Sequence, residues 1–150
     1  MYFARGGFNY YVYVSNSSIR YHDPSGLTAC DVKAAISVAK SIYSDCLENT
    51  GFYKGSTGED AWGYANILTN NIFINSFFFD DKLNRRELLL LLATMIHEAR
   101  HIQDGPLKTL FLSDNDHSEL NRRAENQAMY YFVNFTRTRN NMLVGGACGK

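Results

Sequence analysis

The sequence HEARH at residues 97–101 is the part of the chain best suited to chemistry. On a helix, His97 and His101 lie on one face about one turn apart, so two ring nitrogens can meet a single metal ion. Zinc binds neutral imidazole, and a catalytic zinc site uses three protein ligands and leaves the fourth position to water. Glu98, next to the first ligand, can take a proton from that water and hand it to a leaving amine. The spacing therefore predicts a zinc site with Glu98 as general base.

The third zinc ligand must come from another part of the chain. The pattern HExxHxxGxxH is not met, because positions 104 and 107 hold Asp and Leu. A carboxylate from a downstream helix is then expected, and Glu125 is favoured because the small Ala128 follows it on the same face and lets two helices approach closely. Glu119 is the second candidate. Asp116 and His117 remain open, although Asp116 is also suited to cap the helix.

Two helices are expected to position these residues. Asn84 and Glu87 have the spacing of a capping box and precede an apolar run, which predicts a helix over residues 85–103 that ends at the Asp-Gly-Pro of residues 104–106. A second helix is predicted over residues 117–135. Its apolar stripe consists of Leu120, Ala124, Ala128, Tyr131, Phe132 and Phe135.

The remaining segments predict a smaller β component and one more helix. Apolar spacing predicts a helix that Asp31 caps and Gly51 ends, followed by a loop over residues 51–60. Residues 71–79 are rich in β-branched and aromatic side chains and indicate a strand, which is a candidate to pair with an extended peptide substrate. Residues 1–29 indicate a β-hairpin.

Composition narrows the classes of function. The chain has 150 residues, 45% of them hydrophobic, which is enough to bury a core without staples, so a bound metal is expected to be catalytic. The net charge of zero argues against nucleic acid or an anionic membrane as partner. Three cysteines without a CxxC pair favour free thiols in a reducing compartment, with one disulfide as the alternative.

The N-terminal segment resembles a known family. Residues 6–16 (GGFNYYVYVSN) and 19–27 (IRYHDPSGL) resemble the end of the Rhs/YD-repeat-associated core, which reads like GGxNLYxYVxNNPxxYxDPxGL. The chain departs from it at residues 17–18, which are Ser-Ser in place of Asn-Pro. In that family a variable C-terminal toxin domain follows the core. The resemblance implies a core remnant over residues 1–27 and a toxin domain over residues 28–150.

Residues 28–150 in turn look like the small zincin-like metallopeptidase toxins of polymorphic toxin systems. This resemblance implies an α+β fold, mainly helical, with a small sheet beside the HExxH helix and a β-hairpin in front. It also implies a protein or peptide substrate, a cognate immunity protein, synthesis in the bacterial cytoplasm and delivery into target cells. Two alternatives stay open: a metal-binding interaction module without catalysis, and a toxin of other chemistry such as a nuclease, for which the chain offers no HNH-like set.

Overall fold

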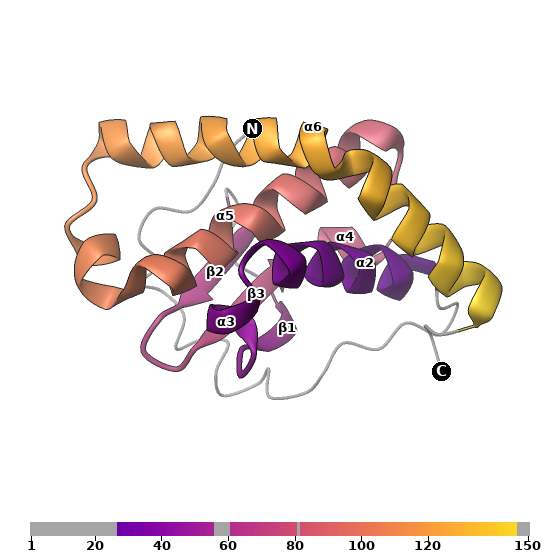
Figure 1. Ribbon diagram of the computed structural model, residues 1–150, viewed down its shortest axis with the longest axis horizontal. Coiled ribbons are helices and arrows are strands. Elements are labelled where there is room, and N and C mark those ends of the chain that lie inside the picture. The colour runs from indigo at the N-terminus through magenta and orange to yellow at the C-terminus, as the bar shows by residue number, and fades with distance from the viewer. Residues whose placement is uncertain (1–26, 56–60, 81, 147–150) are drawn as a thin grey trace.

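The structure is a computed structural model that describes residues 27–55, 61–80 and 82–146 (Figure 1). The predicted N-terminal hairpin and nearly all of the Rhs-like segment fall on residues 1–26, outside these ranges.

The described residues form an α+β fold dominated by helices, as predicted. The helices are α2 (Leu27–Ile42), α3 (Ser44–Leu47), α4 (Phe77–Asp80), α5 (Arg85–Leu110) and α6 (Asp114–Gly145), and the strands are β1 (Gly51–Gly55), β2 (Gly63–Asn66) and β3 (Asn71–Asn75). The long helices α5 and α6 lie against each other, and α2 packs against both (Figure 1). The sheet lies beside α5, which contacts both β2 and β3.

The sheet has the strand order β1-β3-β2, with β1 parallel and β2 antiparallel to β3. The predicted loop over residues 51–60 therefore begins with a strand. The predicted strand over residues 71–79 ends at Asn75, whose side-chain Oδ1 accepts a hydrogen bond from Phe77 N–H at 2.9 Å and opens α4. Because β3 has a partner on each side, the prediction that it pairs with a substrate peptide is wrong.

The capping box predicted at the start of α5 is confirmed. Asn84 Oδ1 accepts from Glu87 N–H and Glu87 Oε1 accepts from Asn84 N–H, each at 2.9 Å. The helix is predicted to end at residues 104–106, but in the structure these residues form a kink within α5. Gly105 has φ +82°, a left-handed value that glycine adopts without strain, and helix resumes with Pro106 and continues to Leu110.

The predicted cap at Asp31 is wrong, because α2 begins at Leu27 and Asp31 lies inside it. The Asp31 carboxylate is buried and forms an ion pair with the Arg139 guanidinium of α6. The buried charge therefore ties two helices together across the core.

The start of α6 also differs from the prediction. Ser113 is the N-cap, and its Oγ accepts from Asp116 N–H at 3.1 Å, so Asp116 lies in the first turn and does not cap the helix. The predicted apolar stripe is confirmed. Leu120, Ala124, Ala128 and Phe135 are buried in the core, and Tyr131 and Phe132 are partly buried against it.

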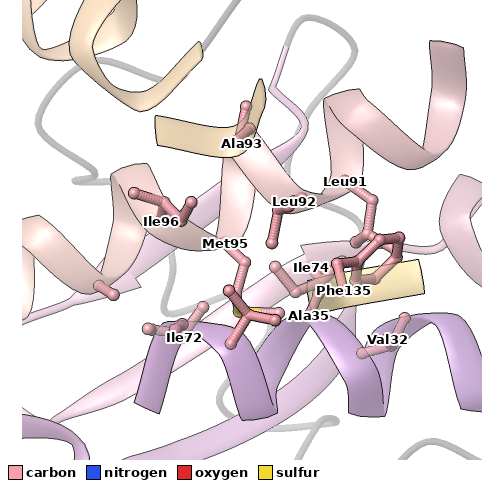
Figure 2. Close-up of a cluster of buried hydrophobic side chains, with 14 of the residues drawn as sticks. Val32, Ala35, Ile72, Ile74, Leu91, Leu92, Ala93, Met95, Ile96 and Phe135 are labelled. Carbon is pink, nitrogen blue, oxygen red and sulfur yellow. The ribbon is translucent and has the colours of Figure 1, made fainter. Parts of the chain in front are cut away.

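The core forms where α5 meets the other elements. Leu91, Leu92, Met95 and Ile96 are all at most 1% exposed and carry the apolar face of α5 inward. Figure 2 shows this cluster, in which α5 side chains lie near side chains of α2, β3 and α6. The labelled partners are Val32, Ala35, Ile72, Ile74 and Phe135.

The cysteines only partly follow the prediction of free thiols. Cys46 is free, but Cys30 is disulfide-bonded, so the prediction is wrong for Cys30. Over the ranges that the structure describes, no helix is both long and apolar enough to cross a membrane.

Replacing Arg139 with Leu tests the link between α2 and α6. The change removes the guanidinium from a carboxylate that is 2% exposed, which should lower the free energy of unfolding by about 3 kcal/mol. Arg137→Leu, on the exposed face of the same helix, should change it by at most about 0.5 kcal/mol. Urea denaturation measures both, and equal effects of the two variants would contradict a stabilising pair.

Candidate metal centre

Three histidine side chains converge between α5 and α6. His97 and His101 come from one face of α5, as their spacing predicts, and His117 comes from the first turns of α6. His97 Nε2 lies 3.0 Å from His101 Nε2 and 3.3 Å from His117 Nε2. All three residues are buried, with 1%, 3% and 9% of their surfaces exposed.

His117 reaches this place because of where α6 begins. The connection from α5 to α6 is only three residues long, from Phe111 to Ser113, and the first turn of α6 starts directly after the Ser113 cap. The backbone N–H of His117 donates to Ser113 O at 2.9 Å, so the histidine is fixed inside this turn. The short connection thus folds His117 back over the kinked end of α5.

The structure places His117, which the sequence left as an open alternative, beside His97 and His101, and it does not place the favoured Glu125 there. Among the described residues, the group close enough to share a metal ion is His97, His101 and His117. Glu125 lies eight residues after His117 on α6, which is about 12 Å along the helix axis, so both cannot reach one ion. Glu125 instead lines a cavity near the N-terminal half of α5.

The other predicted alternatives also lie outside the cluster. The Glu119 carboxylate is 41% exposed and pairs with Arg122 and Arg123 on its own helix, at 2.5 and 3.2 Å. This pairing lowers the pKa of Glu119, mainly through the hydrogen bonds from Arg122. Asp116 is exposed in the first turn of α6.

The apolar periodicity of α6 could have predicted that His117 faces α5. His117 precedes Leu120, Ala124 and Ala128 by 3, 7 and 11 residues, so it continues the buried stripe of α6 toward the N-terminus. A histidine on the inward stripe of the helix that follows HExxH is directed at that helix, whereas Glu125 lies beside the stripe.

The histidine cluster suits a metal ion in both spacing and protonation. Burial holds the pKa of His97 well below its ordinary value, and it lowers the pKa of His101 to about 4. Both imidazoles are therefore neutral near pH 7, the form that binds metals. Ligand atoms about 2.0–2.1 Å from one tetrahedral ion lie about 3.3 Å from one another, close to the 3.3 and 3.0 Å that separate His97 Nε2 from the Nε2 atoms of His117 and His101.

Glu98 adds a buried carboxylate directly beside the cluster. Its Oε2 lies 3.9 Å from His97 Nε2 and has no hydrogen-bond partner among the described residues. Burial raises the pKa of Glu98 to about 8, although a hydrogen bond from the backbone N–H of Ala65 opposes this rise. The carboxyl group can therefore exchange a proton near neutral pH.

Glycine at position 63 lets β2 approach this carboxylate. A Cβ atom added at Gly63 would lie 2.6 Å from Thr94 Cγ2 and 3.1 Å from Glu98 Cγ. Because no side chain separates the strand from α5, the next residues of β2 come close enough for Ala65 to bond Glu98. The strand beside α5 thus holds the carboxylate in place.

Comparisons with protein-family models, with curated proteins and with solved structures found no significant match to this chain. Its function is therefore inferred from the chemistry of its own residues.

Gly63→Ala tests the close approach of β2 to α5. The added methyl group would overlap Thr94 Cγ2, and the free energy of unfolding should fall by about 1–3 kcal/mol. Thr94→Ala in the same chain removes the overlapping atom and should recover most of that loss. Gly145→Ala, where an added Cβ meets nothing within 4 Å, should not destabilise the protein. A double variant as unstable as Gly63→Ala alone would show that Thr94 does not set the distance.

Proposed function

We propose that this chain is a zinc-dependent endopeptidase in which His97, His101 and His117 hold the metal and Glu98 is the general base. The observation that carries the proposal is the buried Glu98 carboxylate with one unpartnered oxygen beside three converging imidazoles. A site that only stabilised the fold would take a fourth protein ligand and would gain nothing from an adjacent buried carboxylate.

Zinc suits this donor set. Three imidazoles that leave a fourth position to water are an arrangement found in catalytic zinc sites. When bound, zinc lowers the pKa of water and polarises a carbonyl group. The chain is large enough to form its core from apolar side chains, so the metal is not needed to fold it.

Glu98 supplies the proton transfers of the reaction. Its free oxygen can accept a proton from the attacking water while the backbone N–H of Ala65 holds the carboxylate in orientation. The same group can then donate the proton to the leaving amine. The proposed reaction is hydrolysis of a peptide bond, which yields a carboxylate and an amine.

The biological role proposed for this activity is that of a toxin domain at the end of an Rhs-type protein. The Rhs-like residues 6–27 support it, since a toxin follows the core in that family. A disulfide at Cys30 is suited to a protein that meets an oxidising compartment during delivery. The proposal includes a cognate immunity protein in the producing cell. The substrate is protein and not nucleic acid, in keeping with the net charge of zero.

Glu98→Gln separates metal binding from catalysis. The variant keeps the three imidazoles and should retain zinc, whereas cleavage of a proteome-derived peptide library should fall by at least about 100-fold because the proton acceptor is lost. Mass spectrometry of the peptides and metal analysis of the purified chain measure the two quantities.

Glu119→Gln is the matched control, because Glu119 is an exposed carboxylate outside the cluster, and it should cleave like the wild type. Full cleavage by Glu98→Gln, or no cleavage by the wild type with zinc bound, would contradict the proposed function.

A further inference from the structure

A cavity of about 550 Å³ lies between the N-terminal half of α5 and the middle of α6. Its volume is within the range of sites that take small molecules or single side chains. Its wall includes Trp62, which directly precedes β2, Phe77 of α4, Leu90 and Ala93 of α5, and Met129 of α6. The ring centroids of Trp62 and Phe77 are 5.4 Å apart, so an aromatic surface forms one side.

Three charged residues line this cavity, Arg86, Glu87 and Glu125, so two carboxylates face one guanidinium group. Glu125 lines the cavity, is only partly exposed, and forms no ion pair among the described residues. Glu87 also lines it, but its Oε1 already accepts a hydrogen bond from Asn84 N–H. Arg86 lines the cavity as well, but it is exposed to solvent. The cavity therefore offers an apolar wall with two half-buried carboxylates, of which Glu87 is held in the capping box and Glu125 forms no ion pair among the described residues.

Two elements that line the cavity also lead to the histidine cluster. Ala93 precedes His97 by one turn of α5, about 6 Å along the helix axis. Trp62 directly precedes Gly63, whose backbone lies against Glu98. A peptide whose scissile bond lies at Glu98 would therefore have a neighbouring side chain within reach of the cavity.

We propose that this cavity binds an arginine or lysine side chain of the peptide substrate, with its alkyl stem on the Trp62 side and its cationic end on Glu125. This assignment rests on the proposed peptidase function for the nature of the ligand. An aromatic face beside a carboxylate suits such a side chain, because the ring attracts the cation and covers the stem, while the carboxylate pairs with the charge. Glu125 is then a specificity residue and not a zinc ligand.

The sole tryptophan of the chain makes the binding measurable without hydrolysis. Trp62 fluorescence of the full-length Glu98→Gln chain is followed while acetyl-Gly-Arg-Gly-amide is added, and the titration is repeated with the same peptide carrying uncharged citrulline. The arginine peptide should give a saturable change and bind about tenfold more tightly than the citrulline peptide. Adding Glu125→Gln should bring the two affinities to within about twofold, whereas adding Glu119→Gln should leave the preference unchanged.

Equal affinities for the two peptides, a preference that survives Glu125→Gln, or no saturable change would overturn the assignment. Zinc content measured on Glu125→Gln should equal that of the parent chain, and its loss would also overturn it. Because the titration needs no cleavage, its failure would leave the peptidase proposal standing, and that proposal is tested separately by loss of cleavage in Glu98→Gln.

Discussion

The packing of α6 against α5 is the constraint on which the candidate site depends. Two of the three imidazoles are on α5 and the third is on α6, so the cluster exists only when the helices lie in one register. Small side chains make this close approach possible, since Ala124 and Ala128 carry the buried stripe of α6. The short turn after the Gly105 kink sets the register by placing the first turn of α6 over His101. Core packing and site geometry are therefore consequences of one interface.

The sheet supports the other half of the site. β2 lies close against α5 because Gly63 has no side chain, and the Ala65 N–H of this strand donates a hydrogen bond to the Glu98 carboxylate beside the histidine cluster. The Glu98 side chain would otherwise be a buried acid with no fixed orientation. Burial thus acts on both halves of the site: it keeps the imidazoles of His97 and His101 neutral, the form that binds metals, and it raises the pKa of Glu98.

Features that depend on local spacing could be predicted from the sequence. The capping box at Asn84, the helix that follows it and the pairing of His97 with His101 all arise from residues within one or two turns. Features that depend on tertiary contacts could not. Residues 51–55 look like a loop, because their glycines and lysine have low strand preference, yet they pair along β3. Asp31 has the type of a cap residue, yet its charge is matched by Arg139, 108 residues away.

The third position of the cluster is the most instructive of these differences. A carboxylate on the following helix is chemically reasonable, but the choice between Glu125 and His117 depends on which residue begins α6. Ser113 caps the helix earlier than Asp116 would, and the inward stripe then extends back to His117. The third member of the cluster thus depends on the hydrogen bond that starts α6, which the spacing within HExxH does not encode.

The most direct test of the central claim is zinc-edge X-ray absorption of the purified full-length chain. The three-histidine centre predicts three imidazole nitrogens at about 2.0–2.1 Å with one further light atom, and no carboxylate from Glu125. The spectrum should be unchanged in Glu125→Gln and should lose one imidazole, or the metal itself, in His117→Ala. Two imidazoles in the wild type, a sulfur ligand, or an unchanged spectrum in His117→Ala would contradict the account.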